Sequence, residues 1–202
     1  MPKSKILQDD VSYSFQSYFE MPHEPEEILA ELGCSLTLTE LSLPKTQRSL
    51  PYLEDLRQRI RSILPLISLT SETARREALI APILMEVARD CNCPLKMEYS
   101  LHVDPWLTGP VDYLLRSAKS LLVVSAQKHD LTRGFTQLAV ELIALSKVQE
   151  QSLLYGAVTI GNVWQFGIMH TPDRRIIQDM HLYAVPDQLE DLVSILVGIL
   201  EP

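Results

Sequence analysis

A strict alternation of apolar and polar residues marks the stretch from Leu95 to Val103. Its odd-numbered positions are apolar, and its even-numbered positions, from Lys96 to His102, are polar. Because successive side chains of a β-strand point to opposite faces, this period predicts a strand with one face toward a core. Further segments with strand-like composition between turn residues are 36–43, 110–116, 120–127, a hairpin over 153–169 that turns at Gly161-Asn162, and 175–184.

Apolar residues recur at helical spacing in a second set of segments. These are 51–64, 71–89, a stretch capped by Asp130 or Thr132 that runs to about 148, and 188–200, together with a short helix that begins at Pro25 and ends before Gly33. Pro82 lies inside the second segment and should bend or divide it. Asp187 and Glu190 predict a capping box for the last helix, which is apolar on nearly every side and should be buried or cover an interface.

The order helix, three strands, helix, strands, helix predicts the α/β (α+β) class, with a central mixed sheet flanked by helices. Residues 69–202 would form this domain. Residues 1–68 would form an N-terminal extension with an arm, two helices and a short strand. The aromatic residues between Tyr13 and Phe19 indicate an arm that packs onto something.

Composition narrows the class of protein. The chain has 202 residues, of which 46% are hydrophobic and 22% charged, as in an ordinary soluble globular domain. No apolar run is long enough to span a bilayer, and the N-terminus has no secretory h-region. Three cysteines, Cys34, Cys91 and Cys93, are typical of reduced thiols in a cytoplasmic protein. Cys91 and Cys93 lack the second pair that a structural zinc site needs.

The net charge of −8 counts against strong binding of duplex nucleic acid, for which phosphate neutralisation supplies most of the affinity. Arginines nevertheless cluster at 57–61, 75–76 and 174–175. Such runs can form a basic patch, or they can be solvated helix faces and ion pairs. Sequence leaves both readings open.

Asp112 is the first residue to examine for chemistry. It stands in the middle of an apolar predicted strand. A carboxylate is costly to bury there unless it has a partner, and the usual partner is a cation.

The motif around Asp112 resembles the PD-(D/E)XK nuclease superfamily. Gly109-Pro-Val-Asp112-Tyr113 is followed by a short turn and by the apolar strand that ends in Val123-Val-Ser125-Ala-Gln127. In that family an Asp, a second acid and a Lys converge on a magnesium ion and an attacking water. Family members close to this chain would read V-V-E-A-K where it reads V-V-S-A-Q.

The resemblance covers about residues 71–168 and implies a restriction-endonuclease-like core. Its longest matching segments are T-S-E-x-A-R-R-E from Thr70 and R-G-F-x-Q-L-x-x-E-L from Arg133. Similar segments occur in uncharacterised cyanobacterial members of the superfamily. Residues 1–65 of this chain loosely resemble the N-terminal extension of those members.

The resemblance also places the remnants of an active site. Ser125 stands at the second acid and cannot supply the negative charge that magnesium prefers, and Gln127 stands at the lysine and cannot supply positive charge. Glu77 stands where a helix acid leans toward the metal, so Asp112 and Glu77 are the candidate metal ligands. An exposed Glu77 paired with an arginine is an equal alternative. Gln137 corresponds to a glutamine that recurs near the family's active site.

Two residues are candidates for restoring activity. Lys128 is adjacent to the expected lysine, but it would point to the opposite face unless a bulge rotates it. Glu141 lies one helical turn beyond Gln137 and on the same face, so it could reach inward as a migrated acid.

These observations predict a catalytically degenerate nuclease-fold protein, a pseudoenzyme that binds or scaffolds through a protein partner or a homodimer. One alternative is a magnesium-dependent DNA or RNA endonuclease that uses Glu77, Asp112, a migrated acid and Lys128. Another is nucleic-acid binding without cleavage through the arginine clusters. No membrane association is expected.

Overall fold

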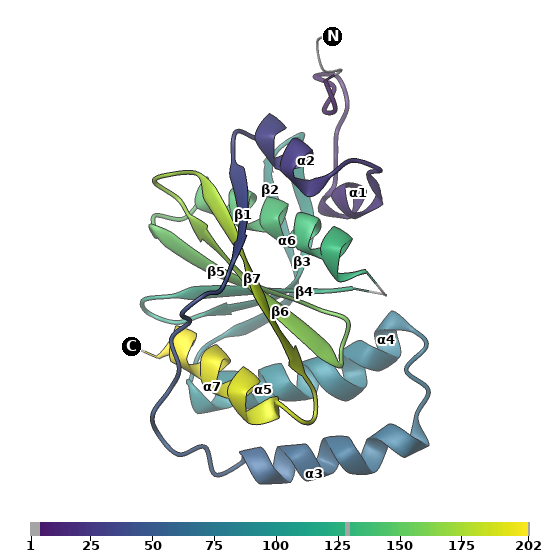
Figure 1. Ribbon diagram of the computed structural model, residues 1–202, viewed down its shortest axis with the longest axis vertical. Helices are drawn as coiled ribbons and strands as arrows, with labels where there is room; N and C mark the ends of the chain where they lie inside the picture. Colours follow the sequence, from purple (N-terminus) through teal and green to yellow (C-terminus); the bar gives the residue numbers. More distant parts are fainter. Residues whose placement is uncertain (1–4, 128–129, 202) are drawn as a thin grey trace.

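The computed structural model describes residues 5–127 and 130–201, and within them seven strands form one mixed sheet. Its order is β1-β7-β6-β5-β4-β3-β2 (Figure 1). The strands are β1 (Ser35–Thr39), β2 (Leu95–Asp104), β3 (Leu107–Arg116), β4 (Leu121–Ala126), β5 (Leu153–Thr159), β6 (Val163–His170) and β7 (Arg175–Ala184). The mixed α/β class and the central mixed sheet are therefore confirmed.

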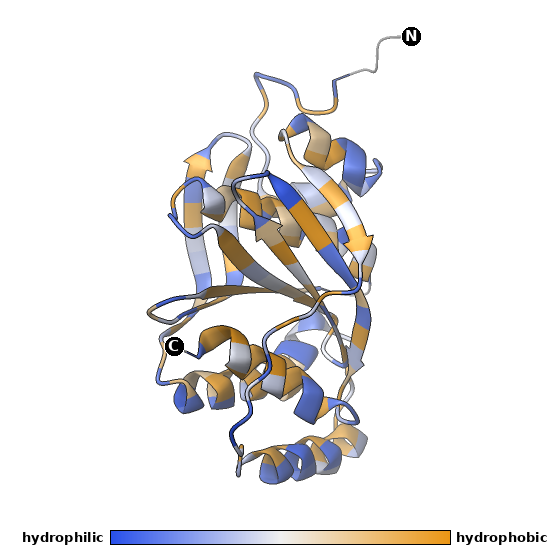
Figure 2. Cartoon of the chain, turned by 60° about the vertical axis from the view of Figure 1, so that its left-hand side comes forward, coloured by the Kyte–Doolittle hydropathy of each residue, from blue (hydrophilic) through white to orange (hydrophobic). Residues whose placement is uncertain are grey.

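Helices cover both faces of the sheet and enclose two hydrophobic cores. On one face lie α1 (Phe15–Glu20), α2 (Pro25–Glu31) and α6 (Leu131–Ser146). On the other lie α3 (Leu53–Ile63), α4 (Glu72–Arg75), α5 (Ala81–Asp90) and α7 (Leu189–Leu200). Figure 2 shows the central strands and α7 largely in the hydrophobic colour, as expected for elements between or against two layers.

The pairing of the strands explains why β4 is central. β2, β3 and β4 form an antiparallel meander, and α6 then crosses over so that β5 pairs parallel to β4. All six residues of β4 are buried because helices cover both of its faces. The predicted meander and the predicted hairpin of β5 and β6 are confirmed.

The N-terminal residues share the sheet and the cores with the rest of the chain. β1 pairs parallel with β7, and α1 packs against α6 and β3. Phe15 and Tyr18 are buried, and the Tyr18 hydroxyl donates a hydrogen bond to the Trp106 carbonyl at 2.6 Å. The aromatic arm thus packs over the sheet as its composition predicts.

The helix predicted at 71–89 is divided. A π-helical turn, η2 (Arg76–Ile80), joins α4 to α5, and Pro82 stands directly after this turn, in the first turn of α5. A short 3-10 turn, η1 (Leu64–Leu66), follows α3. The predicted capping box of α7 is wrong: the N-cap is Gln188, whose side chain caps no α7 amide and instead accepts a hydrogen bond from the Ala184 amide.

Candidate functional site

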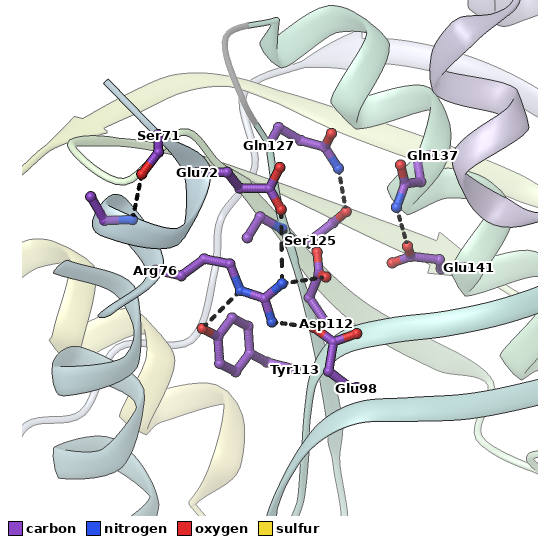
Figure 3. Close-up of polar contacts among 12 residues, drawn as sticks. Ser71, Glu72, Arg76, Glu98, Asp112, Tyr113, Ser125, Gln127, Gln137 and Glu141 are labelled. Carbon is purple, nitrogen blue, oxygen red and sulfur yellow. Dashed lines mark hydrogen bonds and ion pairs between the residues drawn. The ribbon is translucent and has the colours of Figure 1, made fainter. Parts of the chain in front are cut away.

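Asp112 lies on β3 with its carboxylate directed toward the end of β4 (Figure 3). Its Oδ2 accepts a hydrogen bond from the Ala126 amide at 2.7 Å, and its Oδ1 lies 3.4 Å from Nη1 of Arg76. Burial raises the pKa of Asp112 from 3.8 to about 6, although the Ala126 hydrogen bond and the Arg76 charge both lower it. The buried carboxylate therefore does have the cation that its place in an apolar strand requires.

Arg76 is the centre of the ionic contacts at this site. The π-helical turn directs its guanidinium to Asp112, to Glu98 on β2 and, at 3.8 Å, to Glu72 of α4. The guanidinium also lies over the Tyr113 ring, 5.2 Å from its centroid, and within 3.4 Å of the Tyr113 hydroxyl. Sequence reasoning missed Arg76, and the requirement for a cation beside Asp112 was the signal that pointed toward it.

Ser125, near the end of β4, and Gln127, directly after it, stand where the resemblance places the second acid and the lysine. Both are buried, and Nε2 of Gln127 donates a hydrogen bond to Oγ of Ser125 at 2.8 Å. The start of α6 packs closely against this pair: a Cβ added at Gly134 would lie only 2.5 Å from Cγ of Gln127. Two neutral side chains thus satisfy each other at these two positions.

Gln137 and Glu141 form a second buried pair on α6, as their spacing predicts. Nε2 of Gln137 donates to Oε1 of Glu141 at 2.9 Å. Burial, and next the charge of Asp112, raise the pKa of Glu141 well above its usual range, while the Gln137 hydrogen bond lowers it. Within the described residues, Oε1 of Gln137 and Oε2 of Glu141 have no hydrogen-bond partner.

A small polar pocket of about 100 Å³ opens beside these groups. Its lining comes from α1 and the preceding residue, α4, β3, β4 and α6: Ser14, Gln16, Phe19, Glu72, Pro110, Asp112, Ala126, Gln127 and Gln137. The acid contributed by the divided helix is Glu72. Ser14, Gln16 and Phe19 of the aromatic arm form one wall of the pocket.

Comparisons with protein-family models, curated proteins and solved structures give no match to this chain. What the site can do must therefore follow from its own residues. In the part of the chain that the structure describes, no helix has the length and apolar character needed to cross a membrane.

The sequence-based site residues are brought together only in part. Asp112, Gln127 and Gln137 line the polar pocket, whereas Glu77 lines a separate hollow against Ile60 of α3. Lys128 lies outside the described residues. Among residues 5–127 and 130–201, no group of three or more His, Cys, Asp or Glu side chains is placed to hold a metal ion.

The arginine clusters are engaged with acids or with backbone carbonyls. On α3, Arg57 pairs with Glu54 and Glu190, Arg59 with Glu86, and Arg61 with Asp187. Arg174 donates to the Leu32 carbonyl, and Arg175 lies 3.8 Å from Asp173. The ion-pair reading of these runs therefore describes them better than a basic patch.

Proposed function

We propose that this chain has a nuclease-like fold, does not cleave phosphodiester bonds, and acts as a binding or scaffolding module through protein contacts. The observation that carries the proposal is the Ser125–Gln127 hydrogen bond, 2.8 Å long, at the two positions where cleavage needs an acid and a lysine. Ser125 is neutral, so it adds no charge to a dication site, and Gln127 cannot stabilise charge on a phosphate.

The element order supports a restriction-endonuclease-like core. A divided helix precedes the meander β2-β3-β4, and α6 then leads to β5, which pairs parallel to β4. This order is what the resemblance over residues 71–168 implies. Asp112 comes from the second strand of the meander and Ser125 from the third, as the motif requires.

The charges around Asp112 also support a protein that does not bind a catalytic metal there. A magnesium ion is held by several oxygen ligands with negative or partial negative charge. Here the guanidinium of Arg76 lies 3.4 Å from Asp112 and also contacts Glu98. A dication at Asp112 would meet this fixed positive charge, so Arg76 takes the place of a metal as the partner of the carboxylate.

Exposed apolar side chains support protein contact as the remaining role. Leu66 is 78% exposed and follows α3, whose Ile63 lines an apolar hollow of about 370 Å³ with Ala78 and Pro82. An apolar hollow open at the surface is the kind of feature that another chain covers.

One observation favours a second candidate, a magnesium-dependent nuclease with a migrated acid. Glu141 has an unpaired carboxylate oxygen among the described residues and interacts electrostatically with Asp112. If Glu141 replaced the missing acid, Asp112 and Glu141 would share a metal.

A cleavage assay separates the two candidates. The purified protein is incubated with magnesium or manganese and with single- and double-stranded DNA and RNA. The proposal predicts no more cleavage from the native protein than from Asp112→Ala. Metal-dependent cleavage that disappears in Asp112→Ala and in Glu141→Gln would establish the nuclease instead.

A further inference from the structure

The polar pocket beside Asp112 has one wall where an arginine faces a carboxylate and one whose hydrogen bonds are incomplete. At the first wall, the guanidinium of Arg76 faces the Asp112 carboxylate. At the second, Gln137 lines the pocket and is backed by Glu141 (Figure 3). The two walls therefore differ in what they still need.

Each of the two amide nitrogens at the second wall donates one of its two N–H groups to a neighbour. Nε2 of Gln127 donates to Ser125, and Nε2 of Gln137 donates to Glu141. In the described part of the chain, Oε1 of Gln137 is an acceptor without a donor, and Oε2 of Glu141 also has no hydrogen-bond partner. Gln137 is 6% exposed and Glu141 is 0% exposed, so bulk water reaches them poorly, and unpaired buried acceptors are costly.

We infer that the polar pocket binds a compact organic cation, a guanidinium or primary ammonium head group, whose N–H groups pair with Oε1 of Gln137 and with the acids of the lining. This inference rests on the proposed function and names what the binding module holds. The lining contains the acids Asp112 and Glu72, and none of its nine described members is basic. Arg76 pairs with both acids and with Glu98, so three acids share one arginine and the group keeps a negative charge that fits such a ligand.

The size of the pocket limits the ligand to a head group. Its volume of about 100 Å³ is well below the roughly 300–1,000 Å³ of pockets that enclose whole small-molecule ligands. A methylammonium or a guanidinium fits this volume, whereas a nucleotide does not. Phe19 of α1 offers an apolar wall for the carbon stem of such a group.

The distribution of the acceptors favours an N–H cation over a bare metal ion. A dication needs several oxygens converging on one point, and the described residues contain no group of three acidic, His or Cys side chains placed for it. A guanidinium or ammonium instead projects several N–H groups in different directions and can reach acceptors that lie apart. The chain itself already places one guanidinium, that of Arg76, against Asp112.

The test is a titration of the full chain, labelled with ¹⁵N, with methylguanidinium and with methylammonium at constant ionic strength. The side-chain amide signals of Gln127 and Gln137 are followed by NMR. Both probes should shift these signals saturably. Tetramethylammonium, which has the same charge but no N–H group, should not. The absence of a saturable shift, or an equal response to tetramethylammonium, would overturn the inference.

Two variants locate the site. Glu72→Gln removes one partly exposed acid from the pocket and should weaken binding about tenfold, a typical effect of losing a charged partner. Glu54→Gln makes the same change on α3, where Glu54 is 59% exposed, and should leave binding unaltered. Equal affinities for the two variants would contradict the assignment.

Two sources of the cation are distinguished by comparing agmatine with a short arginine-containing peptide. Tighter binding of the peptide indicates a side chain of a partner protein, and tighter binding of agmatine indicates a free small base. Failure of the inference and failure of the proposed function give different results. If the amide signals do not shift and no nuclease activity is found, only the cation site is overturned. If metal-dependent cleavage is found and is lost in Asp112→Ala, the proposed function is overturned.

Discussion

Nη1 of Arg76 lies 3.4 Å from Oδ1 of Asp112, so a cation from the chain itself faces the carboxylate at the centre of the site. The two residues are brought together because the π-helical turn Arg76–Ile80 packs over the meander that carries Asp112. This contact gives Asp112 a structural role that needs no metal.

Stability should depend on the titration of Asp112. The pKa of this acid is raised from 3.8 to about 6 in the folded protein, so its contribution to stability is complete below about pH 4 and is lost as the pH rises through 6. The difference corresponds to about 3 kcal/mol, at about 1.4 kcal/mol per pKa unit. Urea unfolding measures the free energy of unfolding of the native protein and of Asp112→Asn at pH 4, 5, 6 and 7. The difference between the two proteins should change by a value of this order across that range.

That comparison uses the variant as its reference because other acids act in the opposite direction. Hydrogen bonds and nearby cations lower the pKa values of Glu31, Asp104 and Glu201, which destabilises the protein at low pH. A difference between native protein and Asp112→Asn that stays constant from pH 4 to 7 would show that Asp112 does not titrate in this range.

Removal of Arg76 should leave a buried carboxylate without its cation. Arg76→Met is expected to lower the free energy of unfolding at pH 7.5 by on the order of 2 kcal/mol. The loss should be smaller at pH 5, where Asp112 is mostly protonated in the fold. Chemical denaturation at the two pH values measures both effects.

Arg57→Met is the matched control. The side chains of Arg57 and Arg76 are 21% and 20% exposed, but the acids that pair with Arg57 are 59% and 73% exposed. Such surface pairs contribute about 0–1 kcal/mol. If both variants lost the same stability at both pH values, the special role of the Arg76–Asp112 pair would be refuted.

Glu141→Gln should stabilise the protein at alkaline pH. The fully buried Glu141 has a raised pKa, so the folded state loses stability as the pH rises through that value. The neutral amide escapes this cost, and its advantage should be larger at pH 8 than at pH 5. Glu86→Gln, which removes an acid paired with Arg59 and Arg89, should show no such advantage. A Glu141→Gln variant weakened most at pH 8 would indicate that the native carboxylate is charged and bound to a cation.

Gly134 should tolerate no side chain. A Cβ there would lie 2.5 Å from Cγ of Gln127 and 2.8 Å from Cγ2 of Val158, closer than packed atoms allow. Gly134→Ala should therefore cost about 1–3 kcal/mol and displace Gln127 from Ser125. Thermal unfolding tests it against Thr132→Ala, an exposed position in the same helical turn that should change stability by less than about 0.5 kcal/mol. An unchanged midpoint for Gly134→Ala would mean that α6 does not hold Gln127 in place.

Much of the fold follows from local patterns. The existence of β2 and the bounds of β7 are visible in the sequence, and so is the pairing of Gln137 with Glu141, because residues four apart share a helix face. The single core-facing side predicted for β2 is wrong, because Leu95 packs in one core and Leu101 in the other, on either side of Glu98 with its φ of 50°. The order of the strands is different. The parallel pairing of β1 with β7 joins segments more than a hundred residues apart, and no local period specifies it.

Of the candidate site, the sequence could predict only that a buried Asp112 needs a positively charged partner. The sequence shows that Asp112 needs a positive partner, but the choice of Arg76 depends on a π-helical turn and on helix packing. Glu98 reaches the same guanidinium from a backbone with φ 50°, a conformation that few glutamates adopt and that sequence does not announce. The π-helical turn also decides which acid of the helix lines the pocket: it is Glu72, whereas Glu77 faces α3.

The most direct measurement of the central claim is a calorimetric titration of manganese into two proteins. One is the native chain, and the other carries Ser125→Glu together with Gln127→Lys, which introduces beside Asp112 the acid and the lysine that the resemblance implies. The account predicts no saturable binding to the native chain and binding to the double variant. Saturable binding of manganese to the native chain that is lost in Asp112→Ala would contradict it.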